Sequence, residues 1–297
     1  MQQKPKAHLA LLATNIFFAI NFTAVKYLIN SHLVKPFGLN LIRVAVTTIL
    51  LWLIFLFNQR PTNIRKTDIF RFILCALTGI TINQLLFIKG LSLTYSIHAS
   101  LLMLTTPILI TIIATIFLKE RLNKLKIAGL VLGISGAAIL IAARDNTGNP
   151  TDVLWGDILV IINAASYSIY FILVKPLMTE YKPVTVIRMI FTIGLFVMLP
   201  FCWKEFTETP WQSYDIKEFA LLGLIVFGGT FCAYLFNVYG IKILGASIAG
   251  AYIYSQPFFA AIIAMIFLKE QLSLYKIIAA AFILTGVYLA TKSKNND

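Results

Sequence analysis

A sixteen-residue stretch of this chain occurs twice. Residues 107–122 read PILITIIATIFLKERL and residues 257–272 read PFFAAIIAMIFLKEQL, with ten identical positions at a constant offset of 150. A second match, at an offset of 149, relates the FTAVK of residues 22–26 to the FILVK of residues 171–175. The chain is therefore one unit in two copies, and any fold that it adopts has to accommodate that duplication.

Both copies consist mainly of apolar segments. The chain is 59% hydrophobic and 12% charged, whereas soluble domains contain roughly 45–50% apolar residues. Runs of about 20 apolar residues match the length that a helix needs to cross ~30 Å of hydrocarbon, where backbone groups must pair within their own segment. The sequence predicts ten such helices, over residues 8–29, 38–57, 70–89, 97–118, 126–143, 153–174, 184–201, 219–241, 246–268 and 274–291.

The segment RDNTGNPTD at residues 144–152 separates five predicted helices from five others, because it alone has the composition of a loop. We therefore expect two structural units, residues 1–145 and 146–297. Five crossings leave the second unit starting on the opposite side of the membrane, so it runs upside down. The prediction is an all-α integral membrane protein with ten transmembrane helices in two inverted five-helix repeats. Such folds hold a substrate near the midplane and rock around it.

The distribution of the net charge of +13 along the chain indicates the membrane topology. Most Lys and Arg residues flank the predicted helices on the side of the N-terminus, whereas most Asp and Glu residues fall on the other side. This positive-inside pattern predicts an inner-membrane protein with both termini in the cytoplasm. Short loops supply no contiguous basic face, so nucleic acid is not an expected partner. Cys75, Cys202 and Cys232 have no metal-like spacing, and we expect neither a metal nor a cofactor.

The fifth and tenth predicted helices carry small residues at helical spacing and almost no polar side chains. Such faces let helices approach closely in lipid. We expect these helices to serve packing or a homodimer interface, which leaves the protein either a monomer or a homodimer. The small residues are Gly129, Gly133 and Gly136 in one copy and Ala279, Ala280 and Gly286 in the other.

Residues 84–140 and 239–290 resemble the second part of an EamA-type repeat of the drug/metabolite transporter superfamily. The shared features are the duplicated proline, the LKE helix end and the small-residue helix that follows. The resemblance implies a ten-helix carrier of small organic solutes, often an exporter of amino acids or related metabolites. It also implies that helices one to four and six to nine surround a central cavity, with helices five and ten at the periphery.

Pro107 and Pro257 lie inside the fourth and ninth predicted helices, where proline frees the carbonyls of Met103 and Ile253. These positions are either packing kinks or breaks that face the cavity. Polar side chains deep in the spans are candidates for binding a small-molecule substrate, with interhelical hydrogen bonds as the alternative. The candidates are Asn15, Asn21, Asn83, Gln84, Thr106, Tyr167, Tyr170, Tyr234, Asn237, Tyr252 and Gln256. As a set they predict a neutral polar cavity that suits a zwitterionic or aromatic metabolite.

Few charged residues lie within the spans. Arg43 and Arg188, at corresponding repeat positions, either snorkel to the interface or contact a substrate carboxylate. Lys26 and Lys175 are expected to anchor helix ends at the interface. His98 is the one candidate proton site, with a structural hydrogen bond as the alternative. No Asp or Glu is expected at mid-membrane, which favours facilitated diffusion or exchange over proton coupling.

The sequence thus predicts a secondary transporter that exports amino acids or related compounds and works by alternating access. A drug, purine or vitamin permease of the same fold is the alternative. An intramembrane enzyme and a membrane scaffold are kept as rivals, although no buried carboxylate is expected beside any of the three histidines. Glu120 and Glu270, in the two LKE motifs, are expected to pair locally.

Overall fold

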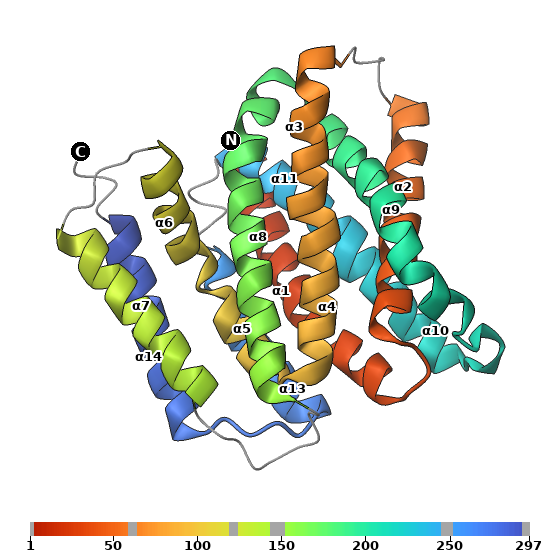
Figure 1. Ribbon diagram of the computed structural model, residues 1–297. Helices are drawn as coiled ribbons and strands as arrows, with labels where there is room; N and C mark the ends of the chain where they lie inside the picture. The colour runs from red at the N-terminus through yellow and green to blue at the C-terminus, as the bar shows by residue number, and fades with distance from the viewer. Residues whose placement is uncertain (1–2, 59–63, 119–123, 143–151, 245–251, 293–297) are drawn as a thin grey trace.

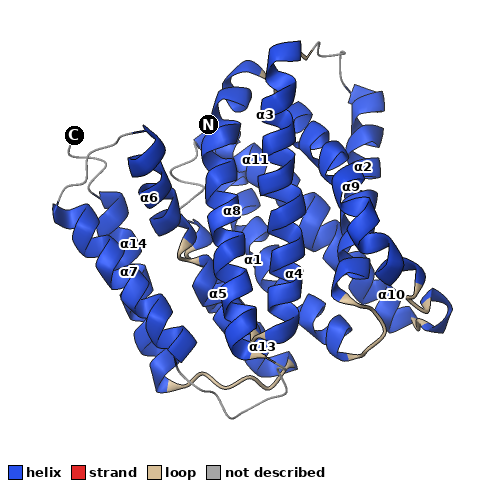
Figure 2. Ribbon diagram, viewed as in Figure 1, coloured by secondary structure: helices blue, strands red, loops and turns tan. Residues whose placement is uncertain are grey.

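The computed structural model describes residues 3–58, 64–118, 124–142, 152–244 and 252–292. Within these ranges the regular secondary structure is entirely helical (Figures 1 and 2). Eight helical segments are long and apolar enough to cross a membrane, and the apolar helices over Gln256–Phe267 and Leu274–Leu289 are shorter. The predicted all-α architecture of ten membrane helices is confirmed.

The first repeat supplies five spans. The third contains a π-helical segment, and the fourth is interrupted between two helices. In chain order its elements are α1 (Gln3–Asn30), α2 (Pro36–Asn58), α3 (Lys66–Ala76), the π-helix η1 (Leu77–Thr81), α4 (Ile82–Leu93), α5 (Ser96–Met103), α6 (Thr106–Leu118) and α7 (Lys124–Ala142).

The second repeat follows the same plan, with a π-helix in its third span and a break in its fourth. Its elements are α8 (Val153–Glu180), α9 (Pro183–Thr207), a short 3-10 turn η2 (Trp211–Ser213), α10 (Ile216–Gly223), the π-helix η3 (Leu224–Cys232), α11 (Ala233–Leu244), α13 (Gln256–Phe267) and α14 (Leu274–Lys292). The start of the ninth predicted span, residues 246–251, lies outside the described residues.

Both duplicated prolines mark breaks between helices. The chain turns at residues 104–105 and again at residues 254–255, and Pro107 and Pro257 then lie in the first turn of α6 and of α13. Proline is tolerated there because its missing N–H has no intrahelical partner at that position. The Thr106 hydroxyl donates to the Met103 carbonyl over 2.7 Å. The Met103 carbonyl that Pro107 frees therefore accepts a side-chain hydrogen bond, and whether the break faces the cavity stays a prediction.

Helices α7 and α14 lie side by side at the periphery (Figure 1). A Cβ added to Gly136 would lie 2.9 Å from the Ala279 carbonyl oxygen, and one added to Gly286 would lie 2.5 Å from the Gly133 nitrogen. The two small-residue faces therefore pack on each other within one chain, as expected for close contact in lipid. A homodimer through these helices would have to use their outward faces, and it stays a prediction.

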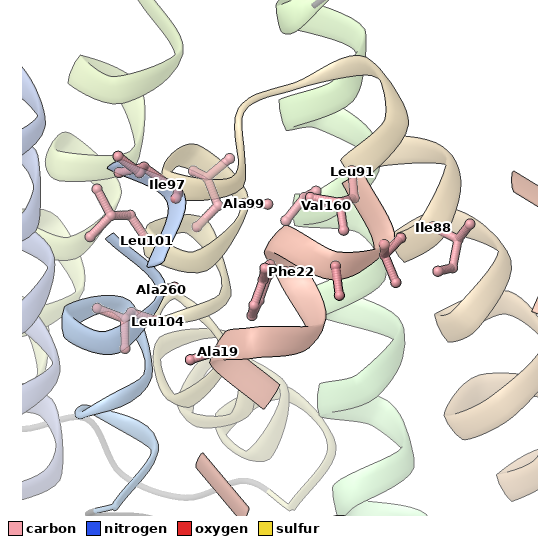
Figure 3. Packing of buried hydrophobic residues seen from close by; sticks show 14 of the residues in the cluster. Ala19, Phe22, Ile88, Leu91, Ile97, Ala99, Leu101, Leu104, Val160 and Ala260 are labelled. Carbon is pink, nitrogen blue, oxygen red and sulfur yellow. The ribbon is translucent and has the colours of Figure 1, made fainter. Parts of the chain in front are cut away.

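The centre of the bundle is packed across the two repeats (Figure 3). Phe22 of α1, Leu101 of α5, Val160 of α8 and Ala260 of α13 belong to one cluster of buried apolar residues. Lipid is as apolar as these side chains, so close packing rather than removal from water stabilises such a cluster. The first helix of each repeat thereby contacts the broken helix of the other, which places any central site between repeats.

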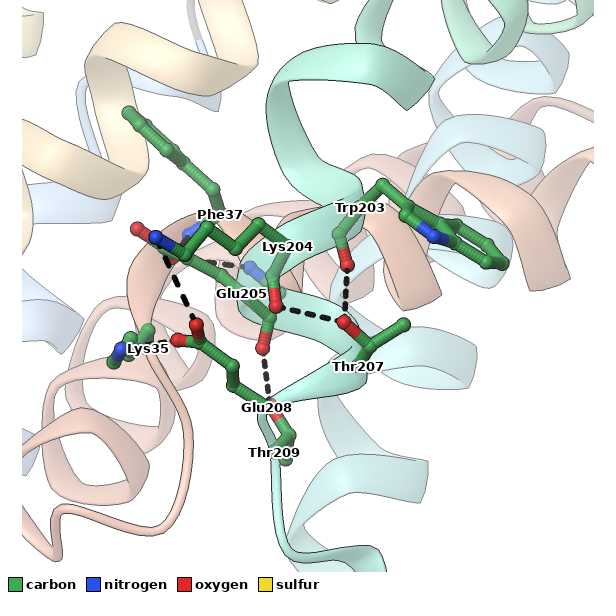
Figure 4. A network of polar contacts seen from close by, with 9 residues as sticks. Lys35, Phe37, Trp203, Lys204, Glu205, Thr207, Glu208 and Thr209 are labelled. Atoms are coloured by element: carbon green, nitrogen blue, oxygen red, sulfur yellow. Dashed lines mark hydrogen bonds and ion pairs between the residues drawn. The ribbon is translucent and has the colours of Figure 1, made fainter.

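One end of the bundle is tied by carboxylates that extend from the end of α9 (Figure 4). Glu205 Oε2 accepts the backbone N–H groups of Phe37 over 2.7 Å and Gly38 over 3.3 Å, at the start of α2. Glu208 forms an exposed ion pair of 2.6 Å with Lys35. This hydrogen bond raises the pKa of Lys35 and lowers that of Glu208. Glu205 therefore satisfies helix donors that would otherwise lack partners.

We expect Glu205→Ala to lower the free energy of unfolding by about 1 kcal/mol, because helix caps contribute about that much. Glu208→Ala, the matched change one turn away, removes only an exposed ion pair and should have a smaller effect. Thermal unfolding of the purified protein in one detergent measures both. Equal losses for the two variants would contradict the assignment of Glu205 as a cap.

Candidate functional site

The two π-helices lie at equivalent positions of the two repeats, because residues 77–81 shifted by 150 fall within η3. Each has a glycine against a side chain from the opposite repeat. A Cβ added to Gly79 would lie 2.5 Å from the Tyr170 ring, and one added to Gly229 would lie 2.5 Å from Asn21 Oδ1. Asn21 and Tyr170 are themselves related by the offset of 149. Single-turn π-helices are frequent at functional sites, and these two meet the other repeat at the centre.

A hydrogen bond links the two repeats at the same level. Gln84 Nε2 donates to the Tyr234 hydroxyl over 3.2 Å. The two residues are 150 positions apart, so they are equivalent, and the pseudo-two-fold axis passes between them. The Tyr234 ring packs edge to face on Phe18 and Phe191, with centroid distances of 6.1 and 5.1 Å. Two of the predicted binding residues therefore meet at the axis.

A polar stripe on α2 faces this point. Asn40, Arg43 and Thr47 follow one another at helical spacing and are 0%, 3% and 0% exposed. Arg43 Nε donates to Thr230 Oγ1 of η3 over 3.2 Å. Arg43 Nη1, Thr47 Oγ1, Asn21 Oδ1 and both polar side-chain atoms of Asn40 have no hydrogen-bond partner among the described residues. Buried polar groups normally have partners, so these atoms indicate a place where a ligand can bind.

We refer to these residues as the central polar cluster: Asn21, Asn40, Arg43, Thr47, Gln84, Thr230 and Tyr234. An aromatic group from α8 lies beside it. The Tyr167 and Tyr170 rings stack at 5.6 Å, and Phe171 meets Tyr167 edge to face at 5.3 Å. Tyr170 belongs to a cluster of buried residues on which Tyr167 and Tyr234 also pack. The site thus combines one buried cation, amides and hydroxyls with an aromatic wall.

Other predicted binding residues bond to the backbone. Asn15 donates to the Leu11 carbonyl over 2.7 Å, and Thr106 bonds within its own turn. The Asn83 carbonyl accepts from Asn163 Nδ2 over 2.7 Å. These bonds fit the alternative of structural hydrogen bonding for the Asn15 amide nitrogen and the Thr106 hydroxyl. Asn15 Oδ1 has no partner among the described residues, and the bond at Asn83 involves only its backbone, so a role for these side chains in binding stays a prediction.

Three further candidates lie on α11, on α13 and just before α13. Asn237 is half-buried and Gln256 is buried at the first residue of α13. Tyr252 forms a 2.8 Å hydrogen bond with His8 Nδ1, near the start of α1. This contact occupies the Tyr252 hydroxyl, and a role for these three residues in binding stays a prediction.

Arg43 and Arg188 are 145 positions apart rather than the 149–150 that relates the two repeats, so the expectation that they correspond is wrong, and their surroundings differ. Arg43 is buried within the bundle, so the alternative that it snorkels to the interface is wrong. The Arg188 guanidinium carbon lies 4.6 Å from the Trp52 ring centroid and 3.5 Å from that of Phe55. Such cation–π contacts stabilise a guanidinium without a ligand, although Arg188 Nε is buried without a hydrogen-bond partner among the described residues. Arg43 is therefore the stronger candidate for a substrate carboxylate.

Two expectations about helix ends are wrong. Lys26 is buried and donates to the carbonyls of Leu91 and Ser92 at the end of α4, over 3.1 and 2.9 Å, so it does not anchor the interface. Glu270 accepts the N–H groups of Ser96 and Ile97 at the start of α5, over 2.8 and 3.0 Å, and does not pair locally. In both cases the partner is distant in sequence.

The counterparts of Lys26 and Glu270 in the other repeat are Lys175 and Glu120. Lys175 is exposed, which fits the interface anchor expected of it. Glu120 lies outside the described residues.

A buried carboxylate accompanies one histidine, contrary to expectation. His98 Nδ1 lies 3.0 Å from Asp157 Oδ2, and both side chains are 0% exposed. Thr94 Oγ1 donates to the other Asp157 oxygen. Asp157 is only four residues from the start of α8. Because charged residues near a loop are usually exposed, the sequence did not indicate that Asp157 is buried.

Two hollows in the described part of the protein are lined by apolar groups. One, of about 240 Å³, lies among α6, α7 and α8 and is lined by residues such as Ile108, Gly133 and Ile161. The other, of about 340 Å³, lies between α2 and α9 next to Phe196 and Trp203. Neither is lined by a residue of the central polar cluster.

The sequence reasoning missed Asn40, Thr47, Thr230 and Asp157. The first two had a readable signal, because with Arg43 they repeat polar residues at helical spacing in an otherwise apolar helix. Thr230 and Asp157 had none, since their roles come from partners far away in the sequence.

The model of the EamA-like transporter family matches residues 5–142 and again residues 154–292. A protein of Archaeoglobus fulgidus named as an uncharacterized transporter is 24% identical over 97% of this chain and 100% of its own length. A probable terminal-alkyne amino-acid exporter of Streptantibioticus cattleyicolor is 27% identical over 97% of this chain and 94% of its own.

One solved crystal structure is similar to the fold, with a TM-score of 0.60 and 17% sequence identity over 96% of this chain and 99% of that one. At this identity the likeness concerns the fold alone. The comparisons with named transporters point away from an enzyme.

Proposed function

The chain belongs to the EamA-like transporter family, and from that premise we propose that it exports amino acids or related zwitterionic compounds by alternating access. It is a multi-pass membrane protein of the cell membrane. In the proposed orientation both termini lie in the cytoplasm, as the charge asymmetry between its two faces favours. The central polar cluster is the proposed binding site, at the level where inverted repeats hold their substrates.

The observation that carries the proposal is the buried, unpaired Arg43. Among the described residues its side chain bonds only to the Thr230 hydroxyl, and no carboxylate forms an ion pair with it. An isolated buried charge is costly, so it persists where it has a partner during function. A guanidinium is suited to a carboxylate, which it can bind through two parallel hydrogen bonds.

The neighbouring groups favour a zwitterion over a simple anion. Asn21 and Asn40 have amide oxygens without partners, and these can accept hydrogen bonds from a substrate ammonium group. The Tyr167 and Tyr170 rings offer an apolar and aromatic surface for a substrate side chain. The name of the Streptantibioticus relative, an amino-acid exporter, supports the same substrate class and direction. A drug, purine or vitamin permease is the alternative within this fold.

Counterflow by the purified full-length protein in liposomes tests the substrate class. Vesicles preloaded with one unlabelled compound would be offered the same labelled compound, with L-amino acids, neutral purines and vitamins each tried in turn. We expect L-amino acids to accumulate transiently, and apolar or aromatic ones most strongly. Liposomes with Arg43→Gln protein provide the matched control for non-specific uptake.

The outcomes separate the candidates. Counterflow of neutral purines at the rate of amino acids would contradict the role assigned to Arg43, because a purine offers no carboxylate. Counterflow of compounds without an ammonium group but with a carboxylate would retain Arg43 and exclude the zwitterion. Efflux from cells overexpressing the protein then decides the direction, and net uptake would overturn export.

A further inference from the structure

The proposed transport site does not use the buried group formed by Thr94, His98 and Asp157, which we name the His98 hub. It joins the end of α4, the start of α5 and the start of α8. Since α4 and α5 belong to the first repeat and α8 to the second, the hub crosses between repeats. It lies at the end of the bundle where the third span finishes and the fourth begins, and movement of one repeat against the other at this end would separate its members.

Charged and titratable groups surround the hub from several helices. Glu270, which follows α13, holds the first turn of α5, and Lys26 of α1 holds the end of α4. Lys276 of α14 lies 4.9 Å from the Tyr95 ring centroid, and Tyr95 in turn lies 5.3 Å from the His98 ring. Tyr275 contacts His98 edge to face at 6.3 Å, and Asp152 caps the start of α8. Charges of both signs are present, so neither sign dominates around the hub.

The hydrogen bonds of the hub leave one place for a proton. Asp157 accepts from the Thr94 hydroxyl and faces His98 Nδ1, while His98 Nε2 is buried without a partner among the described residues. With a proton on Nδ1 alone, the imidazole is neutral and the carboxylate gives the buried hub a net charge of −1. A proton added at Nε2 makes imidazolium and carboxylate a neutral ion pair. Burial disfavours net charge, so it favours the second state.

We propose that the His98 hub is a proton-coupling site, at which opening of this end of the bundle releases one proton from His98 Nε2 to water. Closure takes one proton back from water, and no other covalent bond changes. This assignment rests on the alternating access of the proposed function, and it replaces facilitated diffusion with transport linked to a proton. Because the closed end holds one proton more than the open end, closure is favoured at low pH and lost as pH rises.

At the opposite end of the bundle, the described residues contain no such pair. Position 157 corresponds by the offset of 149 to His8, whose Nδ1 bonds to the Tyr252 hydroxyl. That contact also joins the first helix of one repeat to the broken helix of the other. Its partner is a phenol rather than a carboxylate, so it supplies no compensating charge for an imidazolium. Among the described residues the proposed proton link therefore lies at one end, which would make the cycle directional.

Cysteine accessibility without any substrate tests the proposal. In a background of Cys75→Ala, Cys202→Ala and Cys232→Ala, a single Ser100→Cys reports on α5 behind the hub, because Ser100 is buried. A separate Ser213→Cys protein provides the exposed reference on the same proposed face. Both are labelled in liposomes with a membrane-impermeant maleimide between about pH 6 and pH 8, the range in which histidine titrates.

We expect the ratio of the two labelling rates to rise with pH by up to about tenfold per pH unit, the limit for one linked proton. Asp157→Asn and His98→Gln remove one partner each, and in them the ratio should change less than about twofold over the whole range. Thr94→Ser keeps the hydroxyl donor and should retain the pH dependence.

A pH-independent ratio with the native hub would overturn the proposal, whether or not the variants fold. So would a pH dependence that persists in both Asp157→Asn and His98→Gln. Since the assay contains no amino acid, failure of the amino-acid counterflow would leave its outcome unaffected. The two proposals can therefore fail separately.

Discussion

Arg43→Gln is expected to reduce counterflow of a carboxylate-bearing substrate roughly 100-fold. Removing one partner of a buried charge-assisted contact costs about 2–5 kcal/mol, and every 1.4 kcal/mol corresponds to about tenfold in affinity. Arg43 is buried and bonded only to Thr230 among the described residues, so the change leaves no other charge unpaired. Protein abundance and thermal unfolding should therefore be little changed.

Arg188→Gln is the matched control, because the same substitution is made at the other buried arginine, on the second span of the other repeat. Its guanidinium rests on Trp52 and Phe55, and loss of these contacts costs about 1 kcal/mol of stability. We expect a lower unfolding temperature with transport within about threefold of the native protein. If Arg43→Gln and Arg188→Gln lower transport equally, or if each transport loss parallels abundance, Arg43 does not contact the substrate.

Gly286→Ala is expected to have the largest effect on stability. An added Cβ would lie 2.5 Å from the Gly133 nitrogen and 2.6 Å from the Gly129 carbonyl oxygen, and both are backbone atoms that cannot rotate away. Helices α7 and α14 would have to separate, at a cost of about 1–3 kcal/mol for overpacking. The unfolding temperature in detergent should fall by several degrees, whereas KM should not change, because no residue of the central polar cluster lies on these helices.

Gly223→Ala in α10 provides the control for Gly286→Ala. Nothing lies within 4 Å of a Cβ added there, and alanine favours a helix over glycine by about 1 kcal/mol. This variant should be as stable as the native protein or more stable. A fall in unfolding temperature equal to that of Gly286→Ala would mean that glycine flexibility, and not the close approach of two helices, explains both results.

The fold could be predicted because its determinants are local or periodic. Apolar runs define the ten spans, the duplicated stretch defines the two units, and Pro107 and Pro257 define the breaks. Each follows from the requirement that a backbone in lipid satisfy its own hydrogen bonds. The two π-helices could not be predicted, because a single extra residue per turn leaves the hydropathy of the segment unchanged.

The candidate site was only partly predictable. Gln84 and Tyr234 could be selected as polar residues in apolar helices, and their equivalence was implicit in the repeat. The partners of Lys26, Asp157 and Glu270 could not be predicted, since each contact joins residues more than 50 positions apart. Hydropathy places such charges at the nearest interface, but a distant helix terminus or counter-charge can hold them inside the protein.

The hydrogen bond between Gln84 and Tyr234 has a consequence for movement. If the outward-open and inward-open states are related by an exchange of conformation between the two repeats, the distance between equivalent positions of the repeats is the same in both states. Gln84 and Tyr234 occupy matching positions, so the distance between them is the same in both states. Their contact therefore persists, and the two repeats pivot about it. The contact of His98 with Asp157 joins positions that do not match, and it is therefore free to break.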